Sequence, residues 1–398
     1  MKHSRRTFLG ASAALPALSL PSPVAAETPG RVDSSFDPWV EVRADHLRHN
    51  VEQIRARVSG RPILAVIKNN GYGLGVANVA RVLEPLAPVA GFAVVKLSEA
   101  AALRDAGIRK PILLMGPFDE KNLEEAVARD IMPMVYTPLG PFLDRLASKR
   151  QQAVPIHVCV DTGIGRVGVP YREAESLIRD LAARKSVVIA GTMMTFAEDA
   201  ALDKEQTLRF GALTEKLTRE GVEVGKRHSA SSFALFQHPD AFWDMVRPGM
   251  AIYGVYSELE FRGSAALDLR PAVALKARVA YVKKLPKGES AGYSRAYVAK
   301  EDVWVATLPV GHTDGWPRLA PKGARVRIRG ALYPVVASVS ASHTIVEIGP
   351  ERRVEVGDEV VLFDHEKGSR PEDVSAACGA SVYDLTMHLN PLLPRHVI

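Results

Sequence analysis

Residues 62–73 read Pro-Ile-Leu-Ala-Val-Ile-Lys-Asn-Asn-Gly-Tyr-Gly. A short apolar run with β-branched residues, bounded by turn residues, predicts a buried strand at 63–67. Lys68 then follows the strand in apolar surroundings, which disfavour its charged form and make its amine more nucleophilic. The glycines after it let the backbone approach a bound group closely. The run is typical of a Schiff-base cofactor site, although a lysine at the end of a strand is more often simply solvated.

The alternation of a short apolar run with a longer amphipathic, charged stretch recurs up to about residue 268. The predicted strands are 63–67, 91–95, 111–115, 131–136, 156–160, 187–193, 227–230 and 245–253. Helical stretches between them include 98–106, 120–129, 173–184 and 204–220. About eight such repeats in this length predict parallel strands with helices outside, closed into a (β/α)8 TIM barrel.

The pattern changes after residue 268. Short β-rich runs separated by Gly, Pro and Lys turns occupy 273–282, 303–309, 325–328, 333–339, 344–348 and 359–363, with one helical stretch at 375–380. Such spacing favours a sheet domain over further barrel units. We therefore expect an α/β protein with a TIM-barrel domain at 37–268 and a mainly β domain at 269–398.

The first 26 residues are predicted to be an export signal. A basic start that includes Arg5 and Arg6 is followed by an alanine-rich apolar stretch, which closes with Pro23-Val24-Ala25-Ala26. This order of basic, apolar and small residues is typical of a secretory signal and not of a membrane span. The paired arginines favour the twin-arginine route; an accidental pair in a general secretion signal is the alternative. We expect cleavage after Ala26 and a periplasmic mature protein.

The composition is that of an ordinary globular protein, with 47% hydrophobic and 24% charged residues. The leader holds three basic residues and no acidic one, so its removal lowers the formal net charge from +6 to +3. That charge is too small to indicate nucleic acid binding. No later segment has about 18 uninterrupted apolar residues, so we expect no membrane span in the mature form. Whether the two cysteines, Cys159 and Cys378, pair is left open by the sequence.

Several segments with chemically capable side chains follow predicted strands. They are 161–166 (Asp-Thr-Gly-Ile-Gly-Arg), 228–232 (His-Ser-Ala-Ser-Ser), 247–250 (Arg-Pro-Gly-Met), 292–297 (Gly-Tyr-Ser-Arg-Ala-Tyr) and 311–318 (Gly-His-Thr-Asp-Gly-Trp-Pro-Arg). Active sites of TIM barrels gather at the carboxyl ends of the strands, where Lys68, Arg166, Ser232 and Arg247 would all fall.

In combination these segments make the chain resemble the alanine racemase family, which are pyridoxal-phosphate enzymes built from a barrel and a C-terminal β domain. The resemblance extends over nearly the whole mature chain. It implies a pyridoxal 5'-phosphate-dependent racemase of free amino acids, with alanine as the default substrate. It also implies a homodimer, because Tyr293 matches a base that the partner subunit contributes. Racemisation needs two bases, one on each face of the α-carbon.

The resemblance assigns further roles residue by residue. Lys68 matches the lysine that binds the cofactor and acts as one base, and Arg247, supported by His228, matches the donor to the pyridine nitrogen. The phosphate contacts are matched by Tyr72, Ser232, Gly249 and Met250. Arg166 matches an arginine near the cofactor hydroxyl and the substrate carboxylate, and the other expected substrate contacts are His312 and Ala341.

The chain departs from the family pattern at several positions around the expected pocket. The residues found there are Asn69-Asn70-Gly71, Leu74, Cys159 (for a lysine often carbamylated), Thr195 (for a histidine on the pyridine face), Ser340-Ala341-Ser342, His312 and Pro391 (for two gate tyrosines). Loss of both gate tyrosines should open the pocket mouth. With the export signal, this favours a periplasmic racemase of broad specificity.

Two other functions remain open at this point. A lyase or aldolase of the same fold would need a metal held by closely spaced His and Cys or Asp. His343 is followed by Thr344 and Ile345, and Cys378 has no nearby histidine, so we expect no metal site. The other alternative is a protein that binds the cofactor without turnover, which the altered pocket positions would allow.

Overall fold

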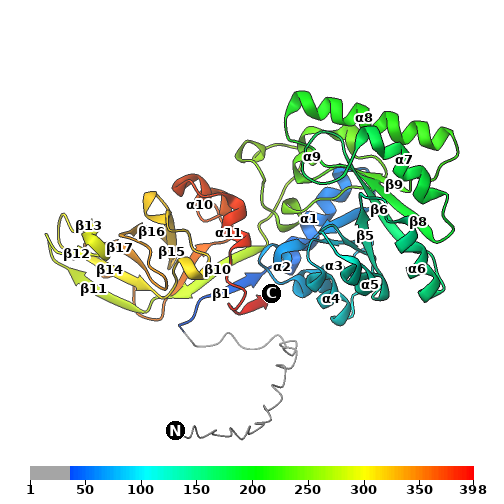
Figure 1. Ribbon diagram of the computed structural model, residues 1–398. Coiled ribbons are helices and arrows are strands. Elements are labelled where there is room, and N and C mark those ends of the chain that lie inside the picture. Colours follow the sequence, from blue (N-terminus) through cyan, green and yellow to red (C-terminus); the bar gives the residue numbers. More distant parts are fainter. Residues whose placement is uncertain (1–35) are drawn as a thin grey trace, which may run out of the picture. The chain divides into compact units, whose positions relative to one another are not determined.

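The computed structural model describes residues 36–398 (Figure 1). The export signal predicted at 1–26 lies outside the described residues. No helix among the described residues is long and apolar enough to cross a membrane. Two large sheets organise this part of the chain, a parallel one in its first part and a mostly antiparallel one in its second.

Seven strands of the first sheet run parallel and follow the order of the sequence, as expected for the barrel. They are β2 (Ile63–Val66), β3 (Val89–Val94), β4 (Ile112–Leu114), β5 (Ile131–Val135), β6 (Val154–Asp161), β8 (Val187–Met193) and β9 (Lys226–His228). Each lies within two residues of its predicted bounds. A short further strand, β7 (Val169–Pro170), pairs with β6.

Helices cover the outside of these strands (Figure 1). They are α1 (Ala44–Arg57), α3 (Val76–Leu83), α4 (Leu97–Asp105), α5 (Glu120–Ala128), α6 (Gly140–Arg150), α7 (Tyr171–Ala182), α8 (Ala200–Arg219) and α9 (Ser232–Gln237). Successive side chains of a strand point to opposite faces of the sheet, so β6 contributes side chains to two packed layers. Ile156 and Val158 pack in a cluster with α7 side chains, whereas Cys159 belongs to the core cluster that includes Met134 and Met193.

The prediction of an eighth strand at 245–253 is wrong. Val246 makes a single parallel bridge to β2, and the chain then enters the 3-10 helix η2 (Met250–Tyr253). The segment still closes the barrel, because the Val246 carbonyl accepts a hydrogen bond from β2 at 2.9 Å while the Arg247 amide donates at 2.8 Å to a carbonyl just after β9. The Pro248 carbonyl also accepts a hydrogen bond from the Val66 amide at 2.9 Å, but Pro248 has no N–H to donate in return. The 3-10 helix η2 begins two residues later.

The second sheet has nine strands in the order β11-β14-β17-β16-β15-β18-β10-β1-β19. Their bounds are β1 (Trp39–Val42), β10 (Val273–Arg278), β11 (Tyr281–Leu285), β14 (Val303–Leu308), β15 (Arg325–Ile328), β16 (Ala331–Val336), β17 (Thr344–Gly349), β18 (Glu359–Phe363) and β19 (Arg395–Val397). The short strands β12 (Ser290–Ala291) and β13 (Tyr297–Val298) form a separate pair. Helix α10 (Pro371–Cys378) begins before its predicted start, and α11 (Val382–Met387) was not predicted.

Strand β1 joins the two ends of the chain. Its residues fall in the range 37–268 assigned to the barrel, yet β1 pairs antiparallel with β10 and parallel with β19 in the second sheet. The alternation used to predict the barrel begins only at β2, so nothing local distinguishes β1 as a strand of the other domain. The Arg395 guanidinium of β19 also donates to the Gly73 carbonyl at 2.8 Å, directly behind the Lys68 turn.

Candidate active site

Lys68 begins a left-handed turn at the end of β2. The φ angles of the next four residues are 54° (Asn69), 56° (Asn70), 62° (Gly71) and 52° (Tyr72). This conformation costs most residues roughly 1–2 kcal/mol each, and Asn and Gly adopt it most readily. The Asn-Asn-Gly sequence at this departure from the family pattern therefore suits the backbone. Glu99 of α4 holds the turn by accepting a hydrogen bond from the Asn70 amide at 2.8 Å.

The surroundings of Lys68 favour the neutral, nucleophilic form of its amine. Its pKa is lowered, first by burial and then by the positive charges of Arg166 and Arg247, while Glu99 acts in the opposite direction. A lower pKa increases the fraction of neutral amine at neutral pH, and only that form attacks an aldehyde. The direction of this shift agrees with the apolar surroundings expected from the sequence.

Tyr72 and Ser232 both lie against Gly249. Ser232 Oγ, in the first turn of α9, accepts hydrogen bonds at 3.0 Å from the amides of Gly249 and Ala251. The Tyr72 hydroxyl lies so close to Gly249 that a Cβ there would be 2.2 Å from the oxygen. Met250 is buried at the start of η2. Because both amides donate to Ser232 Oγ, the hydroxyl hydrogens of Ser232 and Tyr72 are the groups here that can donate to a phosphate.

Burial keeps the phenol of Tyr72 in its protonated form. The ring is buried against Tyr253, with centroids 4.7 Å apart, and burial raises the pKa of Tyr72 well above its ordinary value. The hydroxyl therefore remains a hydrogen-bond donor at any working pH.

Arg247 is held rigidly inside the barrel. Its Nη1 lies 2.8 Å from His228 Nδ1, and its Nη2 donates to the Met194 carbonyl at 2.9 Å and to Thr195 Oγ1 at 3.4 Å. Burial lowers the pKa of Arg247 to about 10, so the guanidinium stays charged at neutral pH. The structure thus brings His228 to Arg247, as the resemblance implies, and Thr195 contacts the same guanidinium.

Two buried polar residues escaped the sequence analysis. His157 of β6 lies 2.8 Å from His228, and its only sequence signal is a polar side chain inside an apolar run. Gln206 of α8 donates to Thr162 Oγ1 at 3.0 Å and to the Thr195 carbonyl at 2.9 Å, and its Oε1 accepts from the Ala197 amide at 2.8 Å. No local pattern separates Gln206 from the other polar residues of its helix.

The loop that carries Arg166 is shaped by its own side chains. Asp161 Oδ1 accepts hydrogen bonds from the amides of Gly163 at 2.9 Å and Gly165 at 3.2 Å. Arg166 is exposed, and its charge depresses the pKa of Lys68. Arg166 therefore acts electrostatically on the lysine.

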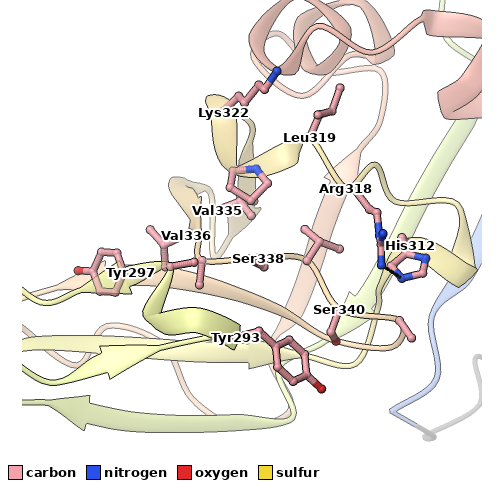
Figure 2. A pocket seen from close by; sticks show the side chains of 15 residues that line it. Tyr293, Tyr297, His312, Arg318, Leu319, Lys322, Val335, Val336, Ser338 and Ser340 are labelled. Atoms are coloured by element: carbon pink, nitrogen blue, oxygen red, sulfur yellow. Dashed lines mark hydrogen bonds between the residues drawn. The ribbon is translucent and has the colours of Figure 1, made fainter.

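The remaining predicted residues lie in the second domain, around a groove of about 830 Å³ (Figure 2). Tyr293 begins the 3-10 helix η4 (Tyr293–Arg295), and the residue is 75% exposed. His312 Nε2 lies 3.0 Å from Arg318 Nη2, and the Ala341 carbonyl accepts two hydrogen bonds from Thr313. Figure 2 shows the Tyr293 phenol projecting from the groove wall without covering it.

The predicted site residues thus form two groups. The barrel group is Lys68, Tyr72, Arg166, His228, Ser232, Arg247, Gly249 and Met250; the β-domain group is Tyr293, His312 and Ala341. Within residues 36–398, no hydrogen bond connects a member of one group with a member of the other.

The barrel group fits pyridoxal phosphate on chemical grounds. Lys68 offers a neutral amine for an aldehyde, the Ser232–Gly249 cradle with the Tyr72 hydroxyl offers donors for a phosphate, and Arg247 offers a fixed donor for a ring nitrogen. The cradle has no room for a side chain at position 249. Across residues 36–398 there is no cluster of three or more His, Cys, Asp or Glu that could hold a metal ion.

Comparison with known families and sequences gives a consistent result. The family model described as alanine racemase, N-terminal domain, matches residues 42–257, and the model described as alanine racemase, C-terminal domain, matches residues 272–397. An alanine racemase of Desulforamulus reducens is 34% identical over 365 residues, which cover 90% of this chain and 98% of that protein. Alanine racemase 2 of Caldanaerobacter subterraneus is 33% identical, covering 89% of this chain and 93% of that protein.

Solved structures resemble the chain over a similar share of its length. The alanine racemase from the D-cycloserine producer Streptomyces lavendulae aligns with a TM-score of 0.85 and 30% identity, covering 92% of this chain and 98% of that one. An alanine racemase of Clostridium difficile aligns with a TM-score of 0.83 and 28% identity, covering 90% and 94%. The arrangement of a barrel followed by a β domain is therefore shared over nearly the whole length.

Proposed function

Because this chain belongs to the alanine racemase family and so is a pyridoxal-phosphate-dependent racemase, we propose that it inverts free amino acids with Lys68 and Tyr293 as two opposed bases. Alanine is the default substrate. The observation that carries the proposal is the barrel group, in which a lysine of lowered pKa lies beside a buried, hydrogen-bonded arginine and a phosphate cradle.

The cofactor, when bound, supplies the electron-withdrawing ring system that makes the α-hydrogen of an amino acid acidic. Lys68, once its amine is free and neutral, can hold a proton taken from one face of the α-carbon. The Tyr293 phenol can deliver a proton to the other face, and the roles reverse for the opposite enantiomer. Arg247 remains charged because its pKa is about 10, so it donates a hydrogen bond and does not give up a proton.

We propose that the working site is completed by a second copy of the chain. The support is that Tyr293 is 75% exposed and, among residues 36–398, is not hydrogen-bonded to the barrel group. A phenol of the partner subunit could then face Lys68 across the substrate. Activity should fall on dilution to concentrations at which the protein is monomeric.

A wide substrate range is proposed from the altered pocket positions. His312 and Pro391 stand where the family pattern has two gate tyrosines, so they leave room for side chains longer than a methyl group. The measurement is kcat/KM over a panel of L-amino acids. Turnover of alanine alone would contradict the proposal.

Export to the periplasm is proposed from residues 1–26 alone. Replacing Arg5 and Arg6 together by lysine should retain the protein in the cytoplasm, because the twin-arginine route reads that pair. Cell fractionation with immunodetection gives the result. Unchanged export would favour the general secretion route instead.

The test of the mechanism is Tyr293→Phe, with Tyr297→Phe as a matched control in the same groove. Loss of a positioned proton donor typically lowers the rate by about 10²–10⁴-fold. Tyr297 donates its hydroxyl to Glu347 at 2.6 Å, so its replacement should leave turnover nearly unchanged. Borohydride reduction followed by peptide mapping should place the pyridoxyl label on Lys68. Full activity of Tyr293→Phe, or a label elsewhere, would overturn the mechanism.

A protein that binds the cofactor without turnover would give a different outcome. It would carry the label on Lys68 yet exchange no α-hydrogen of any amino acid in deuterated water. Exchange at the α-carbon together with formation of the D-isomer supports the racemase.

A further inference from the structure

His157 lies on the face of β6 that points into the barrel. Its neighbours Ile156 and Val158 pack toward the outer helices, so the alternation of a strand directs His157 to the same side as Cys159. The register between β6 and β8 shifts at this point, with Ile156 opposite Ile189 and His157 opposite Gly191. Such a bulge redirects a side chain and is common beside active sites.

Gly191 provides the space for the His157 ring. A Cβ at position 191 would lie 2.7 Å from His157 Nδ1, closer than real Cβ contacts, and Gly191 has no positive φ that would otherwise require glycine. The bulge and the glycine together allow an imidazole at a position where strand pairing would leave no room for one.

The hydrogen bonds of this region form a chain of three side chains. His157 Nδ1 lies 2.8 Å from His228 Nε2, and His228 Nδ1 lies 2.8 Å from Arg247 Nη1. The two imidazoles meet edge to face, with centroids 5.0 Å apart and planes at 72°. Both histidines are almost completely buried.

The direction of each hydrogen bond among these three side chains follows from which groups can donate. A guanidinium only donates, so His228 Nδ1 must accept from Arg247 and cannot carry a hydrogen. A neutral His228 then carries its hydrogen on Nε2 and donates it to His157 Nδ1. His157 in turn carries its own hydrogen on Nε2. Burial lowers the pKa of His157 to about 3 and that of His228 well below its ordinary value, so both rings are neutral at working pH.

We propose that His157 is a positioning residue that locks His228 in its Nε2–H tautomer and thereby fixes the guanidinium of Arg247. Its role at the cofactor rests on the proposed function, in which Arg247 contacts the ring nitrogen. Without an acceptor at position 157, the buried His228 Nε2–H is left unpaired, which is costly. Moving that hydrogen to Nδ1 would instead place two donors face to face and push Arg247 away.

The first measurement is the tautomer of His228 in the cofactor-loaded protein, by two-bond ¹H–¹⁵N correlation spectra with histidine labelling. Loss of signals in His228→Asn assigns the ring. The proposal expects hydrogen on Nε2 and none on Nδ1. Hydrogen on Nδ1 of the wild-type ring would overturn it. This result does not depend on turnover, so it stands or falls separately from the racemase proposal.

The second measurement compares His157→Asn with His157→Leu. These two side chains have nearly the same shape, and both are smaller than imidazole, but only the Asn Oδ1 can accept a hydrogen bond where Nδ1 does. Leaving a buried donor unpaired typically costs about 5- to 150-fold, so His157→Leu should lose that much kcat, with KM little changed. Its His228 should also leave the Nε2–H form. His157→Asn should retain both the tautomer and the rate.

Equal behaviour of the two variants would mean that only ring volume matters and would overturn the role. If His157→Leu does not fold, the tautomer of His228 in the wild type and in His157→Asn still tests the proposal. An unchanged Nε2–H signal with retained kcat in the Asn variant supports the proposal, and a shifted tautomer in that variant contradicts it.

Discussion

Replacement of Gln206 by methionine should destabilise the protein more than the same replacement of an exposed or weakly bonded glutamine on another barrel helix. The amide of Gln206 is completely buried and makes three hydrogen bonds of 2.8–3.0 Å. Methionine has similar length and volume, so it creates little cavity. Thr162 Oγ1 can still donate to Met194 Sδ, at 3.1 Å, but the Ala197 N–H and the Thr195 carbonyl lose their partner.

The magnitude follows from those two groups. A fully buried polar group left unpaired costs about 1–3 kcal/mol. The Ala197 N–H and the Thr195 carbonyl are partly buried, so each should cost near the lower end of that range, and Gln206→Met should lower the free energy of unfolding by about 2–3 kcal/mol. Urea unfolding at a fixed cofactor concentration measures the loss. Gln53→Met is the matched control, because Gln53 makes one long bond of 3.4 Å to the Asp268 amide. It should stay within about 0.5 kcal/mol of wild type.

Gln206→Glu separates hydrogen bonding from packing through pH. The new carboxyl can accept from the Ala197 N–H, but its ionised form faces the Thr195 carbonyl without a hydrogen to donate. The folded-state pKa of that group should therefore lie above its unfolded value of about 4.3. The native state then holds the extra proton, so stability relative to wild type should fall as pH rises from about 4, by up to ~1.4 kcal/mol per unit. A Met variant as stable as the control, or a Glu variant that follows wild type between pH 5 and 8, would refute the reasoning.

Further outcomes can be checked more simply. Gly249→Ala should weaken cofactor binding to the apoprotein by roughly 5- to 150-fold. The reason is that forcing a methyl group to 2.2 Å from the Tyr72 hydroxyl costs about 1–3 kcal/mol. An unchanged Kd in an absorbance titration would contradict this prediction. Arg166→Gln should raise the pKa of Lys68, since a positive charge that favours the neutral amine is lost. The pH dependence of borohydride trapping with added cofactor should therefore move to higher pH. A move to lower pH would contradict this electrostatic effect. Both cysteine thiols are buried and free, and burial raises the pKa of each. A thiol reagent should therefore react with neither cysteine in the native protein and with both after unfolding. Rapid reaction of the native protein would count against the buried arrangement.

The barrel could be predicted because its strands carry their own local signal. Parallel strands buried on both faces are continuous apolar runs, so β3, β5 and β8 were recognisable wherever they ended in turns. The error at 245–253 has a physical cause. The apolar run there continues into η2, and only the position of its neighbours limits the strand to one bridge at Val246.

The sequence points to candidate site residues where the pattern that marks them is local. Lys68 follows an apolar strand and precedes residues that tolerate a left-handed turn, and both features are written in consecutive positions. His157 and Gln206 had no such signal, because a buried polar side chain is recognised by its partners. Those partners, His228 and Thr195, are distant in sequence and become neighbours only at the end of the barrel strands.

The alternation of strands and helices from β2 to β9 and the family were determined by the sequence, since each rests on residues adjacent in the chain or on motifs read together. The cofactor role of Lys68 is a prediction from the same residues. Tertiary structure alone decided that β1 belongs to the second sheet, that Arg247 is held by a chain of histidines, and that Tyr293 stands exposed in a separate group. Strand pairing, burial and hydrogen-bond direction depend on atoms brought together across long stretches of chain, and no local pattern records them.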